Sequence, residues 1–374
     1  MRFHITGGRG ADGHPIEVAV DGDRIAASVG EAATLNAGGL LVVPGLIDLQ
    51  LNGAFGSDFT DDPGSIWRVA ARLPELGVTS FLPTLVSTTM ERIDTARDVL
   101  ARRPSDFIGA QPLGLHIEGP MISRERHGTH PLDRLVPAAS SYDWSPSTGV
   151  ALVTLAPELP GSIEATAELV ERGVVVSLGH SDTTAEIAST AADAGARFGT
   201  HLFNAMSSIT SREPGLAGFL MTDERMRFGM IIDGLHLADR VVRLARAVAG
   251  DRIVLVTDAM AAVGVGDGTY SLADITVHVH GLEARNDIGG LAGSVLTMPL
   301  AVRTFREITG CPLTEAVDAA TERPAAVVGA SDRGSLRVGG RADVTLLDER
   351  FDVAATVVGG QVAFLRDPER LEKA

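Results

Sequence analysis

The stretch GLIDLQLNG (45–53) decides the fold, because it places two polar side chains at the end of a short apolar run. Such a run, at 46–51, is typical of a buried strand in a parallel sheet. Gln50 and Asn52 have the spacing of a metal-binding His-x-His pair at the end of a barrel strand, yet both side chains are amides. The rest of the chain must show whether a metal site has been lost here or reduced.

Seven further apolar runs follow along the chain: TSFLPTL (79–85), LGLHIE (113–118), VALVTLA (150–156), VVVSLG (174–179), RFGTHL (197–202), FGMIID (228–233) and RIVLVTD (252–258). Most of the intervening segments have helical periodicity, for example MERIDTARDVLARR (90–103) and DRVVRLARAVAG (239–250). Buried strands that alternate with helices indicate a parallel sheet covered on both faces. Eight such units predict an α/β fold, a (β/α)8 TIM-like barrel over residues 45–330.

The two ends of the chain have a different pattern. Residues 3–28 and 334–364 alternate with period two and contain turn glycines, which is typical of antiparallel strands. We expect one small β-sandwich domain built from both termini, residues 1–44 and 331–374. Long insertions follow the third strand (119–149) and the eighth strand (259–297), and loops of this length are usually functional.

Composition excludes several classes of protein. The net charge of −16 argues against nucleic-acid binding, because we find no local basic patch to offset it. No apolar run approaches the ~18 residues needed to span a bilayer, and the start of the chain has no signal-like apolar region. With Cys311 as the only cysteine, we expect a cytoplasmic protein without a membrane partner. Lys373 is the only lysine, so the interior offers none for a carbamate bridge between two metals.

Polar residues stand at the predicted carboxyl ends of the strands, where barrel enzymes place their chemistry. They are Gln50, Asn52, His116, Glu118, His180, His201, Asp233, His236 and Asp258. Glu118, His180 and His201 would form a two-imidazole, one-carboxylate set with an open fourth position, as in catalytic zinc sites. Asp258 could take a proton from an activated water and return it to a leaving group.

Each of these residues also has a purely structural interpretation. A histidine at a strand end is more often a hydrogen-bonded structural group, Asp258 could cap a helix, and Glu118 could pair with an arginine. Their coincidence at five strand ends favours the site. The literal His-x-His of VHVHG (277–281) lies in a hairpin-like segment, where we expect a structural or solvated role.

An ordered set of motifs carries a family resemblance: PGLIDLQLNG, GLHIEGP, HGTHP, LGHSD, THLFNAM, REPGLAG, DGLH, TDAM, LAGS and GRADVTLLD. Together they resemble the N-acetylglucosamine-6-phosphate deacetylase family of the amidohydrolase superfamily, over essentially the whole chain. The resemblance implies a metal-dependent (β/α)8 barrel that hydrolyses the acetamide of N-acetyl-D-glucosamine 6-phosphate, releasing acetate, in amino-sugar catabolism or recycling.

By position, the resemblance makes Glu118, His180 and His201 the metal ligands and Asp258 the catalytic acid and base. It also implies a set of substrate contacts: Thr129, His130, Asn204, Ala205, Arg212, Asp233, His236, Leu291, Ala292 and Gly293. The family completes its phosphate pocket across a subunit interface, which implies a homodimer or homotetramer. Either His130 or His236 would stabilise the oxyanion, and the sequence leaves this choice open.

The resemblance also answers the opening question, because some members of the family carry His-x-His and two metals while others carry Gln-x-Asn and one. We therefore expect one divalent metal per chain, with Zn²⁺ favoured over Fe²⁺ or another ion. Gln50 and Asn52 would orient Glu118 or hydrogen-bond the metal-bound water. Two alternatives stay open: an amidohydrolase for an N-acyl-amino acid or cyclic imide, which HGTH and REPG disfavour, and a non-catalytic barrel, which the complete ligand set disfavours.

Overall fold

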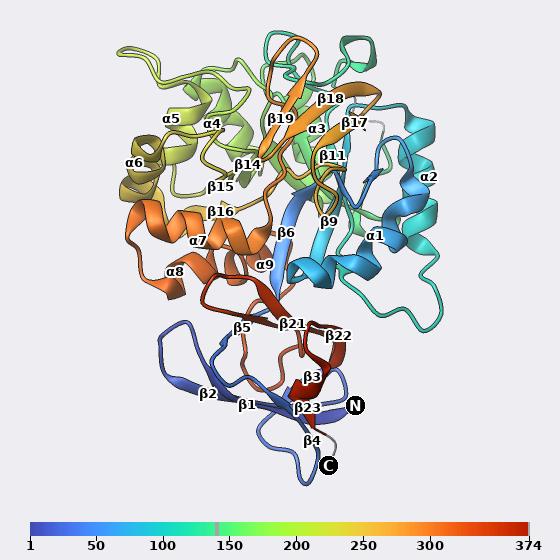
Figure 1. Ribbon diagram of the computed structural model, residues 1–374. Helices are drawn as coiled ribbons and strands as arrows, with labels where there is room; N and C mark the ends of the chain where they lie inside the picture. Colours follow the sequence, from blue (N-terminus) through green and yellow to red (C-terminus); the bar gives the residue numbers. More distant parts are fainter. Residues whose placement is uncertain (139–141, 373–374) are drawn as a thin grey trace.

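The computed structural model describes residues 1–138 and 142–372. Figure 1 shows two regions, a barrel of strands surrounded by helices and a smaller β region that contains both chain termini. The described residues include no helix that is long and apolar enough to cross a membrane.

Eight parallel strands form the barrel, in the spatial order β6-β9-β11-β12-β13-β14-β15-β16. They are β6 (Leu46–Leu51), β9 (Val78–Val86), β11 (Leu115–Glu118), β12 (Val150–Leu155), β13 (Val175–Leu178), β14 (Phe198–Gly199), β15 (Arg227–Met230) and β16 (Ile253–Leu255). No regular ladder joins β16 to β6 among the described residues. A single bridge, Leu51 to Ala259, and the bond from the Asp258 amide to the Gln50 carbonyl (2.9 Å) close the ring. The predicted (β/α)8 fold is confirmed.

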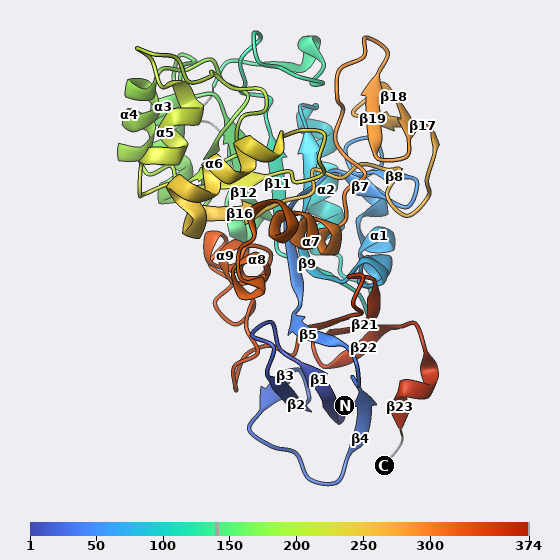
Figure 2. The ribbon, with the colours of Figure 1, turned by 60° about the vertical axis from the view of Figure 1, so that its left-hand side comes forward.

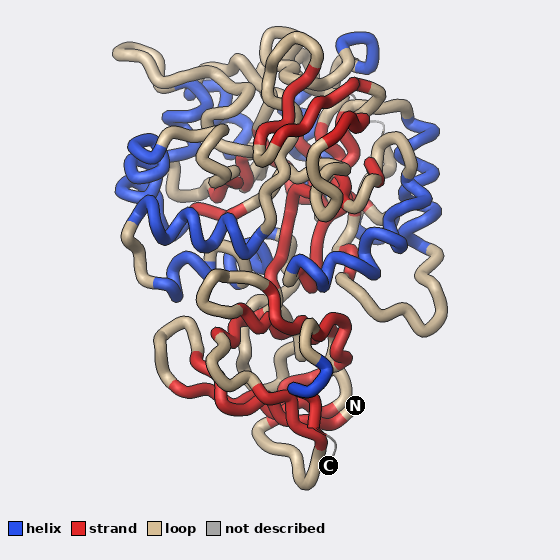
Figure 3. The backbone as a smooth tube through the Cα atoms, in the orientation of Figure 1, coloured by secondary structure: helices blue, strands red, loops and turns tan. Residues whose placement is uncertain are grey.

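Helices cover the outside of the barrel (Figure 3). They are α1 (Ile66–Arg72), α2 (Met90–Ala101), α3 (Ser162–Glu171), α4 (Ala185–Asp193), α5 (Gly215–Thr222), α6 (Asp239–Ala249), α7 (Met298–Thr309), α8 (Leu313–Asp318) and α9 (Glu322–Val327). Helix α6 shows why these segments are helical: Val242, Ala245 and Ala249 recur at helical spacing and are its buried residues. Thr89 caps the start of α2 by accepting a hydrogen bond from the amide of Arg92.

Strands from both chain ends share one nine-stranded sheet. They are β1 (Arg2–Arg9), β2 (Pro15–Asp21), β3 (Arg24–Ala26), β4 (Ala33–Asn36), β5 (Leu41–Pro44), β20 (Val344–Leu347), β21 (Val353–Val358), β22 (Gln361–Leu365) and β23 (Leu371–Glu372). Phe3 and Ile5 alternate with more exposed residues along β1 and are fully buried in a core of this region. Because β5 ends at Pro44 and β6 begins at Leu46, we propose a domain boundary near residue 44, and a second one near residue 331.

The insertion after the eighth strand forms a separate three-stranded antiparallel sheet, β17 (Gly268–Leu272), β18 (Ile275–His280) and β19 (Glu283–Asn286). It lies at the end of the barrel far from the β domain (Figure 2). Val277 and Val279 face its small core, whereas His278 and His280 alternate onto the exposed face of β18. The remaining short strands are β7 (Gly53–Ala54), β8 (Ser57–Asp58) and β10 (Gln111–Pro112).

A buried ion pair joins the two regions. The Arg333 guanidinium donates to Asp343 (2.6 Å), just before β20, and to the hydroxyl of Ser80 on barrel strand β9 (2.9 Å). The two charged side chains are only 12% and 3% exposed. The other oxygen of Asp343 accepts the amide of Gly359 (2.7 Å). One carboxylate therefore organises the contact between barrel and β domain.

We predict that Arg333→Met lowers the free energy of unfolding by roughly 3 kcal/mol, because it leaves the Asp343 carboxylate buried without its main partner. This loss of stability is at the low end of the range for broken buried ion pairs, because Arg341 remains 3.5 Å from the Asp343 carboxylate as a second cationic partner. Urea unfolding measures the loss. Arg366→Met is the matched control: its pair with Asp348 is 47% and 30% exposed, so about 1 kcal/mol or less is expected. Equal losses in the two variants would contradict the structural role of the Arg333 pair.

Candidate active site

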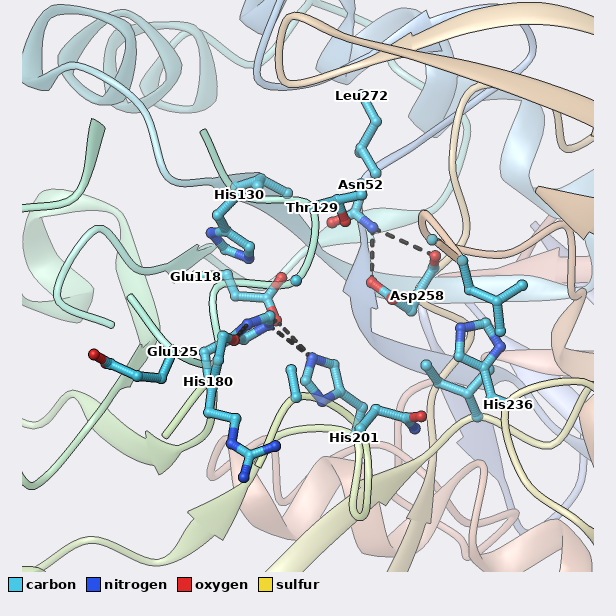
Figure 4. Close-up of a pocket in the computed structure, with 18 residues that line it drawn as sticks. Asn52, Glu118, Glu125, Thr129, His130, His180, His201, His236, Asp258 and Leu272 are labelled. Atoms are coloured by element: carbon cyan, nitrogen blue, oxygen red, sulfur yellow. Dashed lines mark hydrogen bonds and ion pairs between the residues drawn. The ribbon is translucent and has the colours of Figure 1, made fainter. Parts of the chain in front are cut away.

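A pocket of about 310 Å³ opens at the carboxyl ends of the barrel strands. Figure 4 shows Glu118, His180 and His201 gathered on one side of it, with Asp258 and Asn52 facing them. The lining residues are Asn52, Val86, Glu118, Glu125, Arg126, Gly128, Thr129, His130, His180, His201, Asn204, Ala205, Ile231, His236, Asp258, Leu272, Leu291 and Gly293.

The three predicted metal ligands converge within this pocket. Glu118 ends β11, and His180 and His201 each lie two residues beyond the ends of β13 and β14. Both Nε2 atoms lie 3.2 Å from Glu118 Oε1, and 3.0 Å separates them from each other. Two ligands of a tetrahedral zinc ion, with bonds of 2.0–2.1 Å, lie about 3.3 Å apart. The spacing of the three atoms therefore fits one small divalent cation.

The charge of Glu118 and the orientation of the His180 ring also fit a cation. His180 Nδ1 lies 2.9 Å from the carbonyl oxygen of Arg126 and donates to it, so Nε2 is the ring nitrogen that faces Glu118. Burial would raise the pKa of Glu118, but hydrogen bonds from His180 and His201 hold it well below its usual value. An ionised carboxylate and unprotonated imidazole nitrogens are the forms that bind metal.

His130 lies in the same cluster, since ligand atoms of Glu118, His130 and His180 all lie within 4.8 Å of one another. Its hydrogen bonds nevertheless favour a different role. Nδ1 accepts the backbone amide of Ser87 (3.3 Å) and lies 2.7 Å from the Ser87 hydroxyl, so the neutral ring carries its proton on Nε2. Burial, followed by the charge of His180, holds the pKa of His130 well below its usual value. His130 is therefore a neutral hydrogen-bond donor, and His201 offers the third ligand atom of the predicted set.

The two amides link the carboxylates of the site. Gln50 Nε2 donates to Glu118 (3.0 Å) and to Asp258 (3.1 Å), and Asn52 Nδ2 donates to Asp258 (2.8 Å). Only the NH₂ group of an amide can face an ionised carboxylate, because the amide oxygen is solely an acceptor. Gln50 and Asn52 therefore present hydrogen-bond donors, not metal-binding oxygens, in place of a His-x-His pair.

Asp258 is partly exposed, on the pocket side. Desolvation and then the charge of Glu118 raise the pKa of Asp258, and the hydrogen bond from Asn52 opposes the rise. A carboxylate with a raised pKa accepts a proton more readily than an exposed aspartate.

Three residues of the site have left-handed backbone conformations. The φ angles are +48° for His180, +31° for His201 and +51° for Asp258. Residues other than glycine adopt these conformations only where the surrounding structure holds them, and they cluster at functional sites. The backbone therefore turns sharply at the end of each strand, where the side chain enters the pocket.

His236 lines the pocket, and its ring is hydrogen-bonded to Asp233. Its Nδ1 lies 2.7 Å from Asp233 Oδ2, and Asp233 Oδ1 accepts the amides of Leu235 and His236, both at 2.9 Å. Burial raises the pKa of Asp233, but the bonds from His236 outweigh it and leave the pKa below its usual value. Asp233 thus orients His236 and does not itself line the pocket.

The predicted substrate contacts divide into three groups. Thr129, His130, Asn204, Ala205, His236, Leu291 and Gly293 line the pocket. Asp233 and Ala292 are buried and do not line the pocket. Arg212 is exposed, in the loop before α5, and does not line the pocket of its own chain.

Sequence reasoning missed several residues. Arg126 and Glu125 line the pocket from the segment before HGTHP, and adjacency to that motif was the only signal for them. Leu272 enters the pocket from β17, and no sequence pattern pointed to it. His116, counted among the strand-end residues, lies outside the pocket lining. It is buried against the hydroxyl of Thr154 (2.7 Å), and burial lowers its pKa to about 4.

Comparisons with known proteins agree with this geometry. The Amidohydrolase family model matches residues 41–363. The N-acetylglucosamine-6-phosphate deacetylase of Caenorhabditis elegans is 40% identical over 348 residues, which cover 87% of this chain and 83% of the relative.

Two solved structures of the same enzyme are also similar. That of Pasteurella multocida superposes with a TM-score of 0.90 at 30% identity, covering 97% of this chain and 99% of the other. A mutant from Mycobacterium smegmatis, in complex with N-acetyl-D-glucosamine-6-phosphate, gives 0.85 at 32%, with coverages of 97% and 99%. With the family model, the relatives and the folds in agreement, this chain belongs to the N-acetylglucosamine-6-phosphate deacetylase family of amidohydrolases.

Proposed function

We propose that this chain hydrolyses the acetamide of N-acetyl-D-glucosamine 6-phosphate to D-glucosamine 6-phosphate and acetate, as a step in amino-sugar catabolism or recycling. The observation that carries the proposal is the convergence of Glu118, His180 and His201, whose ligand atoms lie within 3.2 Å of one another. Beside them lies Asp258, which accepts a hydrogen bond from the Gln50 amide that also donates to Glu118. The relatives carry the name of this activity, and the Mycobacterium smegmatis structure was solved with this sugar phosphate bound.

The protein residues have distinct roles in the proposed reaction. A divalent ion held by Glu118, His180 and His201 would supply Lewis acidity for water activation and carbonyl polarisation. Asp258 takes the proton of the attacking water and delivers it to the nitrogen of the departing amine. His130 donates a hydrogen bond from its Nε2–H to the developing oxyanion, because its Nδ1 already accepts from Ser87. His236 is the less suitable oxyanion donor, since its Nδ1 donates to the Asp233 carboxylate and the neutral ring then carries a lone pair, not a proton, on Nε2.

The site does not support the two alternative functions, a non-catalytic barrel and a hydrolase of N-acyl-amino acids or cyclic imides. A non-catalytic barrel would have no reason to keep three ligand atoms within 3.2 Å and strained backbone at His180, His201 and Asp258. The relatives described above are named as acetylated amino-sugar phosphate hydrolases, not as hydrolases of acyl-amino acids or cyclic imides.

We predict that Asp258→Asn keeps metal binding but lowers turnover at least ~10²-fold, because the variant cannot accept a proton. Acetate released from N-acetyl-D-glucosamine 6-phosphate measures turnover, and an N-acetyl-amino acid serves as the comparison substrate. A wild-type enzyme that preferred the amino acid would reject the proposed substrate. Near-normal turnover of Asp258→Asn would remove Asp258 from the mechanism.

The metal proposal is one ion per chain, with Zn²⁺ favoured for the two imidazoles and one carboxylate. We expect activity to saturate at one equivalent when metal is titrated into the apo protein, because Gln50 and Asn52 direct NH groups at the position of a second ion. Mass spectrometry of the intact protein under native conditions counts the ions independently of activity. A requirement for two equivalents would contradict the one-metal proposal.

The phosphate proposal involves a second copy of the chain. Arg212 is exposed and makes no side-chain hydrogen bond or ion pair within the part of the chain that the structure describes. The acidic chain repels a dianionic substrate as a whole, so local cations must hold the phosphate. We propose a homodimer or homotetramer in which Arg212 of one subunit completes the pocket of the other.

We also propose a cytoplasmic location for the protein, with which the buried, unpaired Cys311 is compatible.

We predict that Arg212→Ala lowers kcat/KM for the phosphorylated sugar on the order of 30- to 1000-fold, with little change for unphosphorylated N-acetylglucosamine. The exposed Arg240 is the matched control, and Arg240→Ala should change neither value. Co-expression of Arg212→Ala and Asp258→Asn chains tests the subunit arrangement. Mixed oligomers should recover activity, because one pocket then has both groups. Mixed oligomers as inactive as their parents would show that Arg212 does not act across an interface.

A further inference from the structure

We propose that Asp48, which does not line the pocket, is a positioning residue that acts through Thr257 to hold Asp258 in its left-handed conformation. The inference rests on the proposed function, because it takes Asp258 as the proton-transfer group. It concerns how the barrel closes between its first and last strands, at the seam formed by residues 48–52 and 257–259.

Asp48 is a buried carboxylate without a cationic partner among the described residues. It is 1% exposed, on β6, and its contacts are all neutral. Oδ1 accepts the amides of Gln50 (3.2 Å) and Thr257 (3.3 Å), and Oδ2 accepts the hydroxyl of Thr257 (2.5 Å). A buried carboxylate is costly unless such bonds satisfy it, so each of them constrains the backbone that provides it.

The amide, the hydroxyl and the carbonyl of Thr257 all make hydrogen bonds. Besides the two bonds to Asp48, its hydroxyl oxygen accepts the amide of Ala259 (3.1 Å), and its carbonyl accepts the hydroxyl of Ser294 (2.6 Å). Ala259 follows Asp258 directly, so the Thr257 hydroxyl spans the backbone on both sides of Asp258. This hydroxyl connects the buried Asp48 to the conformation of its neighbour.

Asp258 needs this support because its φ of +51° is unfavourable for a residue with a side chain. Its amide donates to the Gln50 carbonyl (2.9 Å), and its carbonyl accepts the amide of Ser294 (2.8 Å). The resulting turn places Oδ1 2.8 Å from Asn52 Nδ2. Relaxation to ordinary backbone angles would move the carboxylate away from Asn52 and from the pocket.

The lack of a regular ladder at the seam explains why a side chain, that of Asp48, has the positioning role. Neighbouring barrel strands elsewhere are paired by regular ladders. The seam instead has the bridge between Leu51 and Ala259 and a short set of backbone hydrogen bonds, from the Asp258 amide to the Gln50 carbonyl and from the Asn52 and Gly53 amides to the Ala259 carbonyl. Asp48 contacts both sides of the seam, through the amides of Gln50 and Thr257. It therefore adds a side-chain link between the two strands to the backbone hydrogen bonds at the seam.

Thr257→Val is the decisive variant, because valine keeps the shape of threonine and removes only the hydroxyl. We expect kcat for the phosphorylated sugar to fall roughly 10- to 100-fold, as displacement of a catalytic group by about 1 Å would cause, with KM and metal content nearly unchanged. Thr257→Ser restores the hydroxyl and should recover most of kcat. Asp48→Asn keeps an acceptor for both amides and should be milder than Asp48→Leu.

Thr356→Val is the matched control. Thr356 is fully buried on β21, and its hydroxyl donates to the Pro74 carbonyl (2.7 Å) away from the pocket. This variant should lose stability to unfolding as Thr257→Val does and keep wild-type kcat. If Asp48→Leu does not fold, the two threonine variants still decide the question.

The possible results distinguish a failure of the positioning role from a failure of the proposed function. A normal kcat for Thr257→Val, with Asp258→Asn inactive, would overturn the positioning role and leave the proposed function intact. Equal losses of kcat in Thr257→Val and Thr356→Val would overturn it as well. A normal turnover for Asp258→Asn would overturn both the proton-transfer role and the inference that depends on it.

Discussion

The site depends on the hydrogen bonds that the Gln50 and Asn52 amides donate to Glu118 and Asp258. Two carboxylates shielded from water repel each other, and this repulsion contributes to the raised pKa of Asp258. Gln50 donates to both carboxylates and Asn52 to Asp258, over distances of 2.8–3.1 Å. The amides thereby favour the ionised form of both groups without a second cation. In the proposed mechanism, Glu118 is then free to bind a metal and Asp258 to accept a proton.

The amides can do this only because the barrel seam brings them to Asp258. The first and last strands meet not through a regular ladder but through one bridge, a short set of backbone hydrogen bonds, the Asp48 carboxylate and the strained turn at Asp258. Strain at the turn is balanced by two hydrogen bonds of Asp258: its amide donates to the Gln50 carbonyl, and its carbonyl accepts the Ser294 amide. Closure of the fold and geometry of the site are therefore properties of the same few residues, at 48–52 and 257–259.

The sequence predicted the barrel strands well because each is an almost continuous apolar run. The run at 46–51 matches β6 in full, whereas that at 197–202 shortens to the two residues of β14, because the backbone turns before His201. Motifs located the pocket lining near Thr129 and Asn204. They could not reveal that Asp233 faces His236, that Arg212 lies outside its own pocket, or that Leu272 enters it. Such facts depend on side-chain direction and on long loops, which local patterns do not encode.

Anomalous X-ray diffraction from crystals loaded with excess Zn²⁺, recorded on both sides of the zinc edge, tests the central claim most directly. The account predicts a single peak in the pocket, within bonding distance of Glu118, His180 and His201, with the NH₂ groups of Gln50 and Asn52 still donating to the carboxylates. A second peak bonded to the amide oxygens of Gln50 and Asn52 would contradict it, because those side chains would then be metal ligands.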